Sequence, residues 1–119
     1  MNEGVSKPDG EGLRKRLDEA VVLQRTVLQL RKDLRDEELP VPALGEGAFE
    51  ALRARVLAIL QQREKEGAHA LGLVVNRVDL TERQVREATA AGGLHALAGS
   101  VVLRCLQKVL SRMRFAGLG

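Results

Sequence analysis

Residues 11–38, EGLRKRLDEAVVLQRTVLQLRKDLRDEE, decide the fold that we expect for this chain of 119 residues. Apolar residues recur along the stretch every seven positions and again three positions later, which is the a/d spacing of a helix that packs along a seam. We therefore predict one long amphipathic helix over 11–38. Its heptad face, the surface that we expect to bind a partner chain, consists of Leu13, Leu17, Ala20, Leu23, Val27, Leu30 and Leu34.

The heptad pattern is only partial. Arg16 and Glu37 stand at the outer d positions, where a coiled coil places apolar residues. Leu17, Val21 and Leu28 lie beside the strict seam and widen the apolar face. A face this broad is more typical of a helix in a bundle core than of a strict two-stranded coiled coil.

The segments after this helix predict a second helix that returns along it. Residues 31–38 are mostly charged and are expected to form a solvated helix end. Residues 39–47, LPVPALGEG, predict a turn, because their two prolines cannot continue a helix. The turn is short enough for a helix over 48–66 to fold back antiparallel onto the first. Gly67 then supplies a C-terminal stop.

Two shorter segments follow. Residues 68–78, AHALGLVVNRV, contain three valines that favour a strand. No second strand is available to pair with it, so we favour a short helix there. Thr81 and Gln84 have the spacing of a capping box, which opens a helix within 79–91. The pair Gly92–Gly93 ends that helix.

The expected fold class is all-α, with a last helix over 94–115. We expect a small helical bundle or an extended helical hairpin with a long, partly coiled-coil N-terminal helix. Residues 1–10 are polar and broken by Gly and Pro, which predicts a disordered lead-in. The rest, 11–119, is expected to form one helical domain, made of a hairpin over 11–66 and shorter helices over 68–115.

The amino-acid composition excludes several classes of function. Aromatic residues make up 2% of the chain, so base-stacking platforms and aromatic-walled pockets are not available in quantity. The single cysteine, Cys105, allows no internal disulfide and no cysteine-based zinc site, and it fits a reducing intracellular setting. We expect no secretory signal and no transmembrane segment, because the longest apolar run, Leu94–Leu103, is shorter than the roughly 18 residues of a span.

Positive charge is concentrated near the C-terminal end. The net charge is +3, and no acid follows Glu87. Cations near a helix C-terminus complement the helix dipole, which accounts for one or two of those present. The remainder indicates an acidic protein surface, a nucleic-acid backbone or an anionic membrane face as the partner. The predicted basic surface consists of Arg104, Lys108, Arg112 and Arg114. The first three are spaced by four residues and therefore lie along one edge of a helix.

We find no pattern that indicates a catalytic, metal or cofactor site. His69 and His95 are isolated in sequence and lack further ligands at metal-binding spacing. Ser111, His95 and Asp79 could be imagined as a triad, but no nucleophile elbow or oxyanion glycine motif accompanies them. Cys105 is expected to be a small core residue, although neighbouring cations favour a reactive thiol.

Residues 80–118 resemble the frame of the bacterial Fis-type helix-turn-helix. A helix start at Leu80–Thr81 leads to Gly92–Gly93, then to an alanine-rich helix and a basic helix that closes on Gly117–Leu118. The resemblance covers the last third of the chain and would imply DNA binding. The turn between the last two helices needs a glycine-apolar-polar break, and Leu103–Cys105 contains no breaker, so we assign no family.

Together these features predict a non-enzymatic subunit or adaptor of a larger intracellular complex, cytoplasmic or nuclear. It would dock on protein partners through its heptad face, in a homo- or hetero-oligomeric helical assembly, and would need no cofactor. The alternative is a nucleic-acid-binding helical module that uses the basic C-terminal helix.

Overall fold

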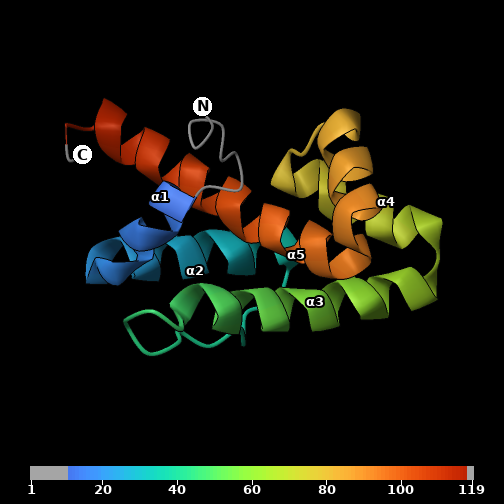
Figure 1. Ribbon diagram of the computed structural model, residues 1–119, viewed down its shortest axis with the longest axis horizontal. Helices are drawn as coiled ribbons and strands as arrows, with labels where there is room; N and C mark the ends of the chain where they lie inside the picture. The colour runs from blue at the N-terminus through green and yellow to red at the C-terminus, as the bar shows by residue number, and fades with distance from the viewer. Residues whose placement is uncertain (1–10, 118–119) are drawn as a thin grey trace.

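The computed structural model describes residues 11–117, which fold into five α-helices and one short 3-10 turn, with no strand among them (Figure 1). The all-α prediction is confirmed, including a helix over 68–78. The predicted disordered lead-in, 1–10, lies outside the described residues. The elements are α1 (Glu11–Lys15), η2 (Arg16–Asp18), α2 (Ala20–Leu34), α3 (Ala48–Glu66), α4 (Ala68–Val78) and α5 (Glu82–Phe115).

The prediction of one long N-terminal helix over 11–38 is wrong, because the chain leaves helical geometry near both ends of the heptad. Glu19 is extended, with φ −92° and ψ 120°, between η2 and α2. Arg35 is left-handed, with a φ of 56°, and ends α2. The breaks lie close to the heptad defects at Arg16 and Glu37, where no apolar side chain could hold a continued helix on the core.

The long helix of the fold is instead α5, with 34 residues. It begins at the predicted capping box: the Thr81 hydroxyl accepts the Gln84 backbone N–H at 3.0 Å, and the Gln84 side chain accepts the Thr81 N–H at 2.9 Å. A kink follows at Gly92 and Gly93, where Gly93 has a φ of 64° and a ψ of −147°, a combination open essentially to glycine alone. We name residues 82–91 and 94–115 the first and second halves of α5.

Helix α5 is the centre of the packing. It packs closely on both α3 and α2, whereas the backbones of α2 and α3 make little close contact with each other. The two segments predicted as a hairpin are thus joined mainly through α5. The radius of gyration is 14.0 Å, close to the roughly 13–14 Å of a compact chain of this length. The fold is a compact globule and not an extended hairpin.

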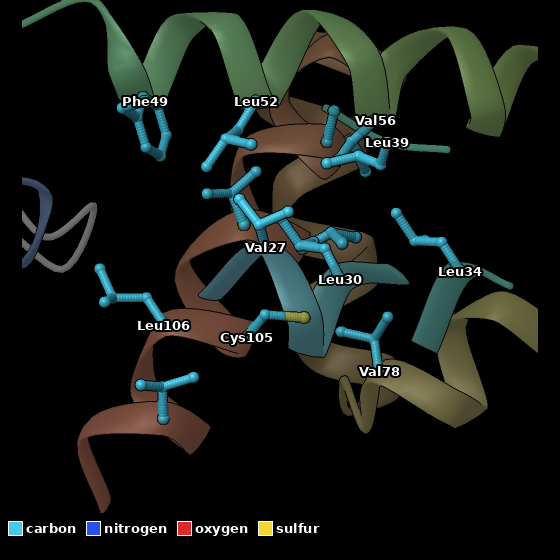
Figure 2. Close-up of a cluster of buried hydrophobic side chains, with 14 of the residues drawn as sticks. Val27, Leu30, Leu34, Leu39, Phe49, Leu52, Val56, Val78, Cys105 and Leu106 are labelled. Carbon is cyan, nitrogen blue, oxygen red and sulfur yellow. The ribbon is translucent and has the colours of Figure 1, made fainter. Parts of the chain in front are cut away.

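The core is aliphatic, as the composition predicts. Side chains from α2, α3, α4 and α5 point into one cluster, which Leu39 of the α2–α3 connection joins (Figure 2). Each fully buried leucine or valine contributes about 1.5–3 kcal/mol relative to an exposed one. The labelled members in Figure 2 are Val27, Leu30, Leu34, Leu39, Phe49, Leu52, Val56, Val78, Cys105 and Leu106.

By length and composition alone, α5 could also cross a membrane, since it contains an 18-residue window with a mean hydropathy of 1.3. In this fold the helix is kinked at Gly93, and Val101, Val102 and Leu106 of its second half are fully buried in the core. The core helix of a protein that spans no membrane meets the same criterion. The property therefore does not by itself indicate a span.

Candidate docking surface

Most of the predicted heptad face lies inside the chain. Five of its seven residues have exposed fractions of 2% or less. Leu13 is half-buried, and Ala20 is exposed. A partner would reach the five buried residues only if η2 and α2 left the fold. These five are Leu17, Leu23, Val27, Leu30 and Leu34.

The two remaining residues that widen the heptad face form the exposed apolar part of α2. Val21 and Leu28 are 53% and 58% exposed. They are seven positions apart and therefore lie on one side of the helix. Leu28 opens onto a groove of about 380 Å³ between α2 and the second half of α5, which we name the α2–α5 groove. It is lined by Arg25, Leu28, Gln29, Lys32, Val109 and Arg112.

Two of the four predicted basic-surface residues tie α5 to its neighbours. A guanidinium N–H of Arg104 donates to the Asp79 carboxylate at 3.0 Å. The Lys108 ammonium donates to the Asp33 carboxylate at 2.8 Å, and its side chain is only 17% exposed. Acids from earlier in the chain thus pair with two cations of the second half of α5, which contains no acid, and these two cations stabilise the fold.

The other two basic-surface residues stay at the surface. Arg112 is exposed, lines the α2–α5 groove and donates to the side-chain oxygen of Gln29 at 2.6 Å. Arg114 is exposed as well. Phe115, one turn beyond Arg112 on α5, is 87% exposed. The end of α5 therefore presents cations together with an apolar ring.

A buried polar network positions Arg112. The side-chain oxygen of Gln29 accepts from Arg112, while its amide donates to Oδ1 of Asp33 at 3.0 Å. Oδ2 of Asp33 accepts from Lys108 and, at 3.5 Å, from the thiol of Cys105. Gln29 and Asp33 are buried, and hydrogen bonds in such surroundings are stronger than in water. This chain of bonds fixes the guanidinium of Arg112 at the wall of the groove.

Sequence reasoning placed Asp33 in a solvated helix end, and the structure corrects this, because Asp33 is buried. The spacing of residues in the sequence did indicate that Asp33 is buried. Gln29 and Asp33 follow the buried Val22 and Thr26 by seven positions each, so they continue a buried face. Only a cation from a distant part of the chain makes burial of this carboxylate tolerable, and the sequence does not show which cation that is.

Cys105 is a free, fully buried thiol, which confirms its expected core position (Figure 2). Burial raises the pKa of the Cys105 thiol, and the Asp33 carboxylate raises it further, while the cations Lys108 and Arg104 oppose this more weakly. The thiol therefore stays protonated near neutral pH and is a poor nucleophile.

The α2–α5 groove carries three cations and no acid. Arg25, Lys32 and Arg112 line it, and none of them forms an ion pair within the described part of the chain. Sequence reasoning missed Arg25 and Lys32, because acids and bases are balanced over the N-terminal third as a whole. Counting charges over a shorter stretch would have found them, because residues 20–32 contain no Asp or Glu.

The residues considered for catalysis are not brought together as a triad. His95 and Ser111 lie on the second half of α5, sixteen positions apart, which places them roughly 24 Å apart along the helix axis. His69 and His95 are both exposed. Within residues 11–117, no group of three or more His, Cys, Asp or Glu side chains is arranged to hold a metal ion.

Comparison with known proteins gives no family for this chain: no family model matches it, and no curated protein or solved structure is significantly similar to it. The function proposed below is therefore inferred from the residues of this chain alone.

Proposed function

We propose that this chain is a non-enzymatic subunit or adaptor that binds an acidic amphipathic helix of a partner protein in the α2–α5 groove. The observation that carries the proposal is the charge of this groove, which has three cations and no acid around the exposed Leu28. A surface of one sign attracts a partner of the opposite sign, speeds the encounter and excludes partners of like charge.

The spacing of the apolar side chains favours a helical partner. Val21 and Leu28 are seven positions apart on one face of α2, the spacing of successive seam positions in packed helices. A partner helix with apolar residues at matching spacing would lie along this face, as in other helix-in-groove complexes. Acids at its flanks would then meet Arg25, Lys32 and Arg112, and these contacts would set the orientation of the partner.

A second copy of this chain fits the α2–α5 groove less well. An isologous dimer brings the same patch of both subunits together. Here that would place Arg25, Lys32 and Arg112 of one copy against the same cations of the other, and like charges in an interface cost several kcal/mol. The sequence did not distinguish a homo-oligomer from a hetero-complex, and the charge of the groove favours the hetero-complex.

The alternative function, nucleic-acid binding through the basic C-terminal helix, receives less support. Arg104 and Lys108 donate to carboxylates of the same chain, so two of its four predicted phosphate contacts are already occupied. Binding by the remaining cations would still weaken steeply as salt rises. A DNA duplex therefore belongs in the same experiment as the acidic peptides.

A defined set of fluorescent peptides tests the proposal. It consists of 18-residue amphipathic helices with leucine at seven-residue spacing and glutamate on both flanks, each paired with a version in which lysine replaces glutamate. Binding to the purified chain is followed by fluorescence anisotropy. The double variant Arg25→Glu/Lys32→Glu reverses two groove charges. Lys65→Glu/Arg86→Glu, at exposed positions outside the groove that form no ion pair among the described residues, is the matched control.

We expect acidic peptides to bind the wild-type chain and the control, with a Kd at least about tenfold weaker for the groove variant. The lysine peptides should not bind the wild-type chain. Absence of binding by every acidic peptide, or equal binding by both charge types, would refute the docking proposal. Salt-sensitive binding of a DNA duplex without peptide binding would establish the alternative.

A further inference from the structure

A second groove, distinct from the α2–α5 groove, lies in the angle between the two halves of α5. Its volume is about 450 Å³, which lies within the roughly 300–1,000 Å³ of small-molecule sites. We name it the kink groove, because the bend at Gly93 brings its two walls together. The groove is hollow because those walls carry small residues, which are Ala88 and Ala91 from the first half and Ala96 and Gly99 from the second.

The kink groove combines apolar walls with cations from three helices. Leu80 and Leu103 extend the apolar lining. Arg14 of α1, Arg53 of α3 and Arg104 of α5 also line it. Two of these arginines are matched within the chain, since Arg53 donates to Glu50 and Arg104 donates to Asp79. Glu87, the one acid among the lining residues, pairs with Arg83 at 3.0 Å.

Arg14 differs from the other two arginines. Its guanidinium lies 4.1 Å from the centre of the Phe49 ring, and Arg53 lies 5.4 Å from the same ring. The Nε of Arg14 is buried and has no hydrogen-bond acceptor among the residues that the structure describes. A buried charged donor without an acceptor is costly and rare. Arg14 lines the kink groove, so an anion held there would accept from its guanidinium, and a small rotation of the side chain would bring the buried Nε to the same anion.

We propose that the kink groove binds a free amphipathic anion, a molecule with one carboxylate and an unbranched apolar chain. The carboxylate accepts hydrogen bonds from Arg14, and the apolar chain lies along the wall of alanines and leucines. A narrow chain suits this wall because its side chains are small. A nucleotide suits it less, because Phe49 is the one aromatic residue in the lining and Arg14 already covers its ring.

Dodecanoate, below its micelle concentration, is the probe that tests this site. Acetate tests the carboxylate alone, and dodecyltrimethylammonium tests the apolar chain with the opposite charge. Binding is measured by calorimetry, and its position by amide chemical-shift changes. The variants are Arg14→Gln, which removes the charge, and Ala91→Leu, which narrows the groove. Arg114→Gln removes an exposed cation elsewhere and is the matched control. Circular dichroism checks that each variant folds, and Ala91→Leu carries the test if Arg14→Gln does not fold.

We expect dodecanoate to bind with shift changes on both halves of α5 and near Phe49, and we expect acetate and dodecyltrimethylammonium not to bind. The Kd should rise at least about tenfold in Arg14→Gln and in Ala91→Leu, and stay unchanged in Arg114→Gln. Equal binding of both charge types, shift changes confined to other regions, or no binding at all would overturn the proposal. So would binding to vesicles of phosphatidylcholine and phosphatidylserine in place of free dodecanoate, since that result indicates a membrane surface as the ligand.

Discussion

The ammonium of Lys108 lies 2.8 Å from Oδ2 of Asp33, although the two residues are 75 positions apart in the chain. The pair joins α5 to α2 at a place where the Asp33 side chain is only 7% exposed. Oδ1 of the same carboxylate accepts from Gln29, whose oxygen accepts from Arg112. Asp33 therefore stabilises the fold and, through Gln29, orients a cation of the proposed docking groove.

Replacing Asp33 with alanine should lower the free energy of unfolding by about 3 kcal/mol, because the partly buried ammonium of Lys108 would lose its carboxylate partner and would keep the Arg77 carbonyl oxygen as its acceptor. Asp79→Asn is the matched control: it also removes the charged partner of a cation on α5, asparagine tolerates the left-handed φ of 71° at this position, and the side chain of Asp79 is 73% exposed. We expect that change to cost at most about 1 kcal/mol. Urea unfolding measures both. Equal losses would show that the Asp33–Lys108 pair is not the buried link described here.

The two sides of α2 should respond differently to the loss of a leucine. Leu30 is fully buried, whereas Leu28 is 58% exposed. Leu30→Ala should lower the free energy of unfolding by about 2–5 kcal/mol, because it leaves a cavity in the core. Leu28→Ala should change it by roughly 0.5 kcal/mol or less. Thermal and urea unfolding measure both changes. A similar loss of unfolding free energy at both positions would mean that α2 does not bury Leu30 and expose Leu28 as described.

Replacing glycine with alanine should change the stability of the fold in opposite directions at two positions. Gly93 has a φ of 64° and a ψ of −147°, so Gly93→Ala should destabilise the fold by about 1–3 kcal/mol. Gly72 lies inside α4 with no atom near an added Cβ, so Gly72→Ala should stabilise it by about 0.5–1 kcal/mol. Melting temperatures provide the comparison. A neutral or stabilising Gly93→Ala would contradict the kink.

The buried thiol predicts a specific dependence on pH. Because the pKa of Cys105 is raised above its ordinary value of 9.0 in the folded chain, the folded chain keeps the thiol proton at a pH where the unfolded chain loses it. The stability that this proton contributes is therefore present below about pH 9 and is lost as pH rises further. Urea unfolding at pH 8 and pH 10 should show a larger loss for the wild-type chain than for Cys105→Ala.

Thiol labelling provides a second readout at Cys105. A thiol that is buried and protonated reacts slowly with a maleimide at neutral pH, so the folded chain should be labelled only in denaturant. Rapid labelling of the folded chain would contradict both its burial and its raised pKa.

Local signals in the sequence predicted the bounds of α3 and the start of α5 well, whereas in α4 the local valine signal favoured a strand. The prolines before Ala48, the glycine at Gly67 and the capping box at Thr81 act within a few residues, so their effect can be read without knowing the fold. The break at Glu19 has neither glycine nor proline near it, and its one sequence signal is the heptad defect at Arg16. Leu17 is buried beside that defect, so tertiary packing outweighs helix propensity here.

The candidate site was only half visible in the sequence for a similar reason. The basic edge of the last helix pointed to Arg112, but the fold decides that Arg104 and Lys108 meet carboxylates while Arg112 does not. Arg25 and Lys32 join Arg112 only because α2 lies beside the second half of α5. Pairing between distant segments of this kind cannot be read from spacing within one helix.

The position of a bound acidic peptide tests the central claim most directly. Amide chemical shifts of the isotope-labelled chain would be recorded during titration with the tightest-binding glutamate-flanked amphipathic peptide. We predict changes along α2 at Val21, Arg25, Leu28 and Lys32 and on α5 around Arg112, with none at Arg83 or Arg86 on the first half. Changes centred on other helices, or the loss of the folded spectrum as α2 leaves the core, would contradict docking in the α2–α5 groove.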